Sequence, residues 1–122
     1  MAIDFNISIY LYMAMTAAAQ LTNVMKTLAD PTRRAVFERL AEREMSVSEL
    51  TASFHVSQPA ISQHLAALRD AGLICARRDG RNAFYRSDPR GLAPLADWVG
   101  RYRALWPARI EKLKRVLKEM DR

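Results

Sequence analysis

Residues 3–12 alternate between apolar side chains and polar or tyrosine side chains, which is the pattern of a half-buried strand. The apolar positions are Ile3, Phe5, Ile7, Ile9 and Leu11. Because an unpaired apolar strand invites aggregation, we expect residues 1–15 to form an ordered, strand-like N-terminal arm that packs on a dimer. Two alternatives stay open: the same residues form an apolar helical arm, or the protein starts at Met13 or Met15.

From residue 16 onward the apolar positions recur at steps of three and four, which predicts amphipathic helices. The first of these covers residues 16–28 and carries Leu21 on its apolar face. Asp30 is a favourable N-cap and Pro31 is tolerated in a first turn, so a second helix should run from there to about residue 43. We assign residues 16–122 to one domain, because a chain of 122 residues suits a single core.

Two short helices around a tight turn come next. Ser46 and Glu49 have the spacing of a capping box, which starts the first of them. His55 lies in the turn, where its tolerance of left-handed backbone helps. Ser57 caps the second helix, and Gly72 is placed to end it. Its buried stripe is predicted to be Ile61, Leu65 and Leu68.

A β-hairpin follows the second short helix. Residues 73–77 and 83–87 are β-like runs, and the loop between them contains Asp79-Gly80, a strong local hairpin signal. Together the elements predict a mainly α fold with a small β-hairpin, which is the winged helix-turn-helix.

Residues 92–120 have a long amphipathic pattern that Pro107 should kink or split. So small a domain cannot cover this wide apolar face alone, so we expect a homodimer that pairs through its first and last helices. A core helix within a monomer is the alternative. The predicted dimerisation residues are Leu21, Val99, Tyr102, Trp106, Ile110, Leu113 and Leu117.

The balance of charge favours a polyanionic partner. Nineteen Lys and Arg residues against thirteen Asp and Glu give a formal net charge of +6. The single cysteine, Cys75, cannot form an internal disulfide, and we interpret it as inert packing. No stretch reaches the roughly 18 apolar residues that cross a bilayer, so we expect no membrane insertion and a cytoplasmic protein.

Double-stranded DNA is the polyanion that this fold is built to bind. A helix fits the major groove, and its polar side chains meet the base edges. The predicted base-reading residues are Ser57, Gln58, Ser62, Gln63 and His64. For His64, a structural hydrogen bond at the helix edge is an equal alternative. Predicted backbone contacts from the hairpin, or wing, are Arg77, Arg78, Arg81, Asn82 and Arg86.

Several motifs resemble those of ArsR-family transcriptional repressors. They are residues 28–34 (LADPTRR), 47–50 (VSEL), 57–65 (SQPAISQHL), 68–74 (LRDAGLI), 78–81 (RDGR) and 84–86 (FYR). The likeness spans about residues 20–118, and the segment 97–106 is similar to the SdpR-like subgroup of autorepressors. The resemblance implies a homodimeric repressor that binds an inverted-repeat operator, usually that of its own operon.

The metal-sensing members of that family differ from this chain at their ligand positions. The short helix predicted at about residues 46–54, which precedes the helix predicted to enter the major groove, has no cysteine pair here. The last helix has no histidine. Soft metals need several converging thiolates or imidazoles, so we expect no metal and no cofactor. Phosphate-binding glycine loops and nucleophile motifs are absent from the sequence too, so we expect no enzyme.

Two other functions stay open. One is an effector-responsive repressor, with a small molecule or protein ligand at the dimer interface. A pocket for this ligand could be lined by Trp98, Tyr102 and Trp106, although core packing explains these residues equally well. The other is an interaction module that uses the long helix and basic surface without DNA.

Overall fold

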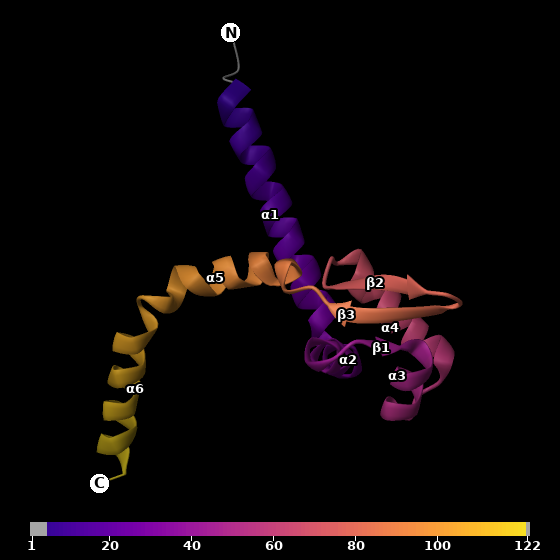
Figure 1. Ribbon diagram of the computed structural model, residues 1–122. Helices are drawn as coiled ribbons and strands as arrows, with labels where there is room; N and C mark the ends of the chain where they lie inside the picture. Colours follow the sequence, from indigo (N-terminus) through magenta and orange to yellow (C-terminus); the bar gives the residue numbers. More distant parts are fainter. Residues whose placement is uncertain (1–4, 122) are drawn as a thin grey trace.

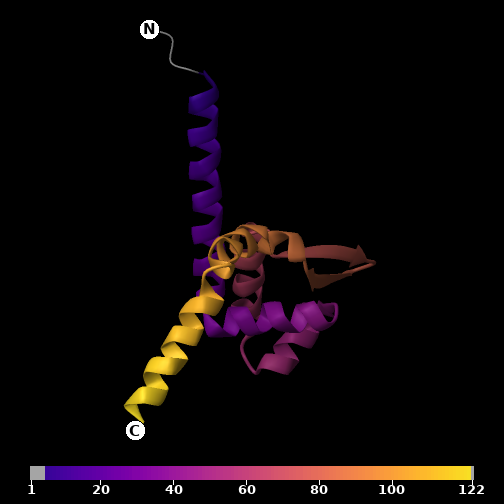
Figure 2. The same cartoon turned by 90° about the vertical axis from the view of Figure 1, so that its left-hand side faces the viewer.

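Short helices packed on a small sheet, whose hairpin projects outward, form the body of the molecule. The helices α1 (Phe5–Ala29) and α6 (Trp106–Met120) extend from this body in different directions (Figure 1, Figure 2). The computed structural model describes residues 5–121, and their side chains from residue 16 onward. The elements are α1 (Phe5–Ala29), α2 (Pro31–Glu42), β1 (Met45–Ser46), α3 (Val47–Phe54), α4 (Gln58–Asp70), β2 (Ile74–Asp79), β3 (Asn82–Ser87), the 3-10 helix η1 (Pro89–Leu92), α5 (Ala93–Arg103) and α6 (Trp106–Met120).

The N-terminal segment is helical, so the predicted strand-like arm is wrong for residues 5–15 and the helical alternative is confirmed. Helix α1 continues without a glycine or proline from Phe5 to Ala29. Apolar residues occupy odd and even positions alike from Ile9 to Met15, so the alternation is too short to specify a strand. Residues 1–4 lie outside the described part of the chain.

The caps predicted for the short helices are confirmed. The Asp30 carboxylate accepts the N–H of Arg33 at 2.9 Å and starts α2. At α3, the Ser46 hydroxyl and the Glu49 carboxylate each accept the other's backbone N–H at 3.2 Å, which completes the capping box. His55 ends α3 in the left-handed conformation with φ 53°. These local interactions fix the angle at which α4 leaves the turn.

Helix α4 ends as the sequence predicts. Gly72 adopts φ +74°, its N–H donates to the Arg69 carbonyl at 2.9 Å, and the Leu73 N–H donates to the Leu68 carbonyl at 2.9 Å. This pair of bonds is a Schellman motif, which turns the chain directly into β2.

The core lies where α1 to α4 meet the sheet. Helix α4 contributes the buried stripe that the sequence predicts. Its side chains are each at most 3% exposed: Ile61, Leu65 and Leu68. The other buried apolar residues are Val24, Val36, Leu40, Met45, Leu50, Leu73 and Ile74. The stripe fixes the rotation of α4 about its axis, because turning it would expose all three side chains.

The sheet has three antiparallel strands in the order β1-β3-β2, one more strand than predicted. The hairpin is confirmed, but its turn is tighter than the predicted loop: Asp79 pairs with Asn82, so Gly80 and Arg81 alone connect the strands. Gly80 has φ +63°, which a glycine adopts without strain. Strand β1 pairs only through Met45 with Tyr85 and Ser46 with Phe84, so the rest of the hairpin projects beyond it.

The predicted long last helix is split, as the alternative at Pro107 anticipated. Helix α5 ends at Arg103, residues 104 and 105 form a turn, and α6 begins at Trp106 with Pro107 in its first turn. A proline has no N–H to donate and is accepted in a first turn, so it marks the start of the new helix.

Candidate nucleic-acid interface

Helix α4 presents its polar side chains to solvent, opposite the buried stripe. Gln58, Ser62 and Gln63 are all exposed. Ser57 is exposed too, although its hydroxyl accepts the N–H of Ala60 at 3.2 Å and so caps the helix. Three of the five predicted base readers therefore stand free on one face of a helix held rigidly by its other face, and Ser57 lies at its start.

His64 is placed differently from the other four. It is half-buried, and its Nδ1 atom is buried without a hydrogen bond to any described residue. The ring lies near the start of α2: the pKa of Asp30 is lowered first by the Arg33 N–H that its carboxylate accepts, and further by charge on His64. The half-buried position suits the helix edge of the alternative for His64, but within the described residues Nδ1 does not form the structural hydrogen bond which that alternative expected.

Arg77 is engaged within the protein. Its Nε donates to Oε1 of Glu44 at 2.7 Å, and its Nη2 forms an ion pair with the same carboxylate. Its guanidinium also stacks over the Phe84 ring, 4.9 Å from the centroid. The hydrogen bond to Glu44 raises the pKa of Arg77 above its ordinary value. Sequence reasoning missed Glu44, because a single glutamate before a strand carries no recognisable signal.

The other predicted wing residues stand free. Arg78, Arg81, Asn82 and Arg86 are exposed, and none forms an ion pair with another residue in the described part of the chain. Arg78 and Arg81 lie on the projecting part of the hairpin, which Figure 1 shows extending away from the body. Exposed, unpaired arginines on a projecting hairpin suit phosphate binding.

Arg33 and Arg34, which follow the start of α2, act inside the fold. Arg34 donates to the Leu28 carbonyl at 2.8 Å, and Arg33 donates to the Thr27 carbonyl at 3.4 Å. Both carbonyls lie in the last turn of α1, where cationic donors satisfy free acceptors.

Apolar side chains continue along the outside of α5 and α6. Trp106 is 51% exposed and Leu113 is 57% exposed. The other exposed large apolar residues of these helices and the turn between them are Val99, Tyr102, Leu105, Ile110, Val116, Leu117 and Met120. Except for the half-buried Leu21 of α1, every predicted dimerisation residue is among them. An apolar surface of this extent is unusual on a monomer.

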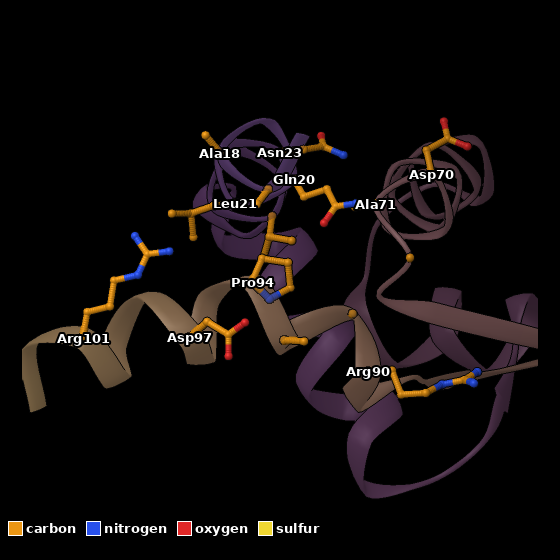
Figure 3. A pocket seen from close by; sticks show the side chains of 15 residues that line it. Ala18, Gln20, Leu21, Asn23, Asp70, Ala71, Arg90, Pro94, Asp97 and Arg101 are labelled. Carbon is orange, nitrogen blue, oxygen red and sulfur yellow. The ribbon is translucent and has the colours of Figure 1, made fainter. Parts of the chain in front are cut away.

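A cavity of about 660 Å³ lies between α1, the end of α4 and one side of α5. Figure 3 shows Gln20, Leu21 and Asn23 of α1 on one side and Pro94, Asp97 and Arg101 of α5 on the other; Ala71, at the end of α4, also lines the cavity. Trp98, Tyr102 and Trp106 are not among its lining residues. Trp98 and Tyr102 instead form an edge-to-face pair with centroids 5.5 Å apart.

Within the described residues, no group of three His, Cys, Asp or Glu side chains could hold a metal ion. Among the helices of residues 5–121, none combines the length and the apolar character that crossing a membrane needs.

A capped helix with a free polar face, beside an arginine-bearing hairpin, defines a winged helix-turn-helix DNA-binding protein. Residues 30–75 match the family described as bacterial regulatory protein, arsR family. Over 77 residues the chain is 47% identical to the HTH-type transcriptional regulator Rv2034 of Mycobacterium tuberculosis, which covers 63% of this chain and 72% of the relative. It is 32% identical over 79 residues to the transcriptional repressor SdpR of Bacillus subtilis, covering 65% and 88%.

Solved structures agree with these relatives. An ArsR-like transcriptional regulator from Rhodococcus sp. RHA1 has a TM-score of 0.66 and 32% identity, covering 81% of this chain and 93% of that one. The chain belongs to the ArsR family of DNA-binding transcriptional regulators. This is a family of regulators and not of enzymes, in agreement with the sequence prediction. SdpR is one of several relatives, so the family is assigned here and the subgroup is not. The match to four other curated relatives spans only 53–59% of the length of each relative.

Proposed function

We propose that the chain acts in the cytoplasm as a homodimeric repressor, related to the SdpR-like autorepressors, that binds an inverted-repeat operator, its own promoter included. The observation that carries this proposal is the free polar face of α4, with Gln58, Ser62 and Gln63 exposed opposite the buried stripe. Glutamine can bond bidentately to adenine in the major groove, and serine can bond to several bases. Binding at a promoter would exclude polymerase.

The wing is proposed to add affinity without sequence choice. Arg78, Arg81 and Arg86 carry free positive charge, and each phosphate they neutralise releases counterions. Asn82 is exposed beside them and can bond to a phosphate or sugar oxygen. The α4 face should therefore determine which sequence is bound, and the wing should determine how strongly binding depends on salt.

A footprint on the DNA upstream of the coding sequence tests this division of roles. Protection of an inverted repeat with half-sites about 34 Å apart supports binding by a dimer. On that duplex, Gln63→Ala should reduce discrimination against mismatched sites, while Arg81→Ala should weaken all duplexes about equally and flatten the salt dependence. Unchanged discrimination after Gln63→Ala would remove Gln63 from the base readers.

The dimer is proposed to form through α1, α5 and α6, because their exposed apolar side chains need a cover that the described chain does not supply. Leu113→Glu should shift sedimentation toward the monomer and reduce operator affinity. Lys112→Gln, on the same helix, is the matched control and should leave both unchanged. A monomeric wild-type chain that still binds the inverted repeat would refute this interface.

An effector-responsive repressor is a second candidate, and the cavity beside α4 favours it. The walls of the cavity come from α1 and α5, which are in the proposed interface, and from residues 70–72 at the end of α4, the proposed DNA-reading helix. A ligand held there contacts both parts and can shift their relative position. Candidate small molecules should be titrated into the protein–DNA complex. Ala18→Phe, which fills the cavity, should abolish any release of DNA; release that persists in this variant places the effector elsewhere.

A further inference from the structure

Arg77 spans the sheet from one edge strand to the other. Its own strand is β2, and its cross-strand partner on β3 is Phe84. Phe84 in turn pairs with Ser46 of β1, so these three residues form one row across the sheet. Glu44, which accepts the Arg77 side chain, comes just before β1. The arginine therefore crosses over the Phe84 ring and is held at the far edge of the sheet.

Toward the hairpin turn, this row is the last one in which the sheet has three strands. Toward the turn, only two pairs remain: Arg78 with Ala83, and Asp79 with Asn82. An isolated two-stranded hairpin is marginally stable, so its direction depends on how its base is held. The opposite face of the base is fixed by Tyr85, which packs on the core.

The charge of Arg77 is largely satisfied by the fold. Glu44 contacts two nitrogens of its guanidinium, and Asp79 lies 3.9 Å from a third. A DNA phosphate that recruited Arg77 would have to break the Glu44 hydrogen bond and place that carboxylate near a second anion. Arg78 has no such partner among the described residues, so it can bind a phosphate without breaking an ion pair.

We propose that Arg77 is a positioning residue of the wing: clamped across Phe84 onto Glu44, it sets the direction in which the hairpin presents Arg78 and Arg81, and it makes no phosphate contact itself. The inference rests on the proposed function, since it presumes that the wing meets DNA. It assigns Glu44, which lies 33 residues before Arg77 in the sequence, a role in operator affinity.

The test uses the full-length protein and the footprinted operator duplex, with affinity measured by fluorescence anisotropy over a range of salt concentrations. Glu44→Gln and Arg77→Gln change the net charge in opposite directions, so the double variant keeps the wild-type charge. Glu42→Gln, on an exposed glutamate of α2, controls for the charge change alone. Arg78→Ala is the positive control for removing a phosphate-binding side chain. Thermal unfolding monitored by circular dichroism confirms that each variant is folded.

Clamping predicts that Glu44→Gln weakens binding although it removes a negative charge. The charge-neutral double variant should weaken binding by about threefold to tenfold for each wing, the range for one ion pair and one cation–π contact, and so by about tenfold to a hundredfold for a dimer with two wings. Its salt slope should equal that of wild type. Arg78→Ala should instead reduce the slope by about 0.9 for each phosphate that is no longer neutralised, or about 1.8 in a dimer. Exchanging the two residues, Glu44→Arg with Arg77→Glu, should restore part of the affinity.

Two results would overturn the inference while leaving the proposed function intact. If Glu44→Gln tightens binding and the double variant reduces the salt slope as Arg78→Ala does, Arg77 contacts phosphate. If the double variant binds like wild type, the clamp has no bearing on DNA. By contrast, a wild-type protein with no salt-dependent binding to the duplex refutes the proposed function itself.

Discussion

Gly91 lies where the segment leading into α5 contacts the end of α4, the helix proposed to read DNA. Replacing Gly91 by alanine should disrupt this contact. Gly91 lies in η1, immediately before α5. Gly72, the left-handed residue that ends α4, packs against it. The orientation of α5 relative to α4 therefore depends on two backbone segments in direct contact.

The magnitude follows from the space available. A Cβ atom on Gly91 would lie 2.2 Å from the Gly72 carbonyl oxygen, whereas ordinary contacts begin at 3.4 Å. It would also lie 2.8 Å from the Gly72 carbonyl carbon and 3.0 Å from the Leu73 Cα. All three atoms are backbone, so no side chain can rotate away. Overpacking typically costs about 1–3 kcal/mol, and we expect the upper end here. For a chain of this size, about 3 kcal/mol lowers the Tm by roughly 12 °C.

Gly100 is the matched control within α5. A Cβ there meets nothing within 4 Å in the described residues. Alanine is favoured over glycine inside a helix by about 0.5–1 kcal/mol, so Gly100→Ala should raise the Tm by roughly 2–4 °C. The two variants make the same chemical change in neighbouring segments and are expected to move stability in opposite directions.

The assay is thermal unfolding followed by circular dichroism at about 222 nm, at one fixed protein concentration because dimerisation makes the Tm depend on concentration. Operator affinity should be measured on the same samples below the transition. Gly91→Ala should weaken binding even where it is fully folded, because a displaced α5 changes the spacing of the two recognition helices. A Gly91→Ala protein that unfolds within about 2 °C of wild type would refute the contact with Gly72.

Three further variants test the core, a cap and an ion pair. Leu68→Ala empties a fully buried site, so urea unfolding should show a loss of about 2–5 kcal/mol; a smaller loss would mean that α4 is loosely packed. Ser46→Ala removes the hydroxyl that accepts the Glu49 N–H and should cost about 1 kcal/mol, and an unchanged Tm would exclude the capping box in solution. The pKa of Asp88 is lowered, chiefly by the Arg90 side chain, so its stabilisation is present above the ordinary value of 3.8 and is lost as pH falls further. Asp88→Asn should therefore be less stable than wild type at neutral pH, with the difference closing in acid; a constant difference would contradict the ion pair.

The helices that carry their own start and stop signals were predictable from the sequence. Asp30, Ser46 and Ser57 each accept the backbone N–H three residues later, and Gly72 ends α4 in a positive φ. Each of these interactions is local, so the residue types at fixed spacing are sufficient to predict it. The exposed face of α4 follows in turn, because the buried stripe determines which side remains.

The N-terminal arm was not predictable in the same way. An apolar run without caps can be a strand or a buried helix, and its periodicity covers too few residues to decide between them. The structure makes residues 5–15 one continuous helix with residues 16–29, whose apolar positions do recur at helical spacing, so the neighbouring segment indicates the structure of the arm better than its own pattern does.

Which arginine of the wing is free depends on pairing between strands, and this is the part of the site that the sequence leaves open. Arg77 and Arg78 are adjacent and chemically identical, yet successive strand residues point to opposite faces. The register that pairs Arg77 with Phe84 and Arg78 with Ala83 places only Arg77 over the ring and within reach of Glu44. A slip of one residue would exchange their roles. The register is determined in turn by the Gly80-Arg81 turn and by the burial of Ile74 and Tyr85 on one face, so the assignment of each arginine follows from the packing of the opposite side of the sheet.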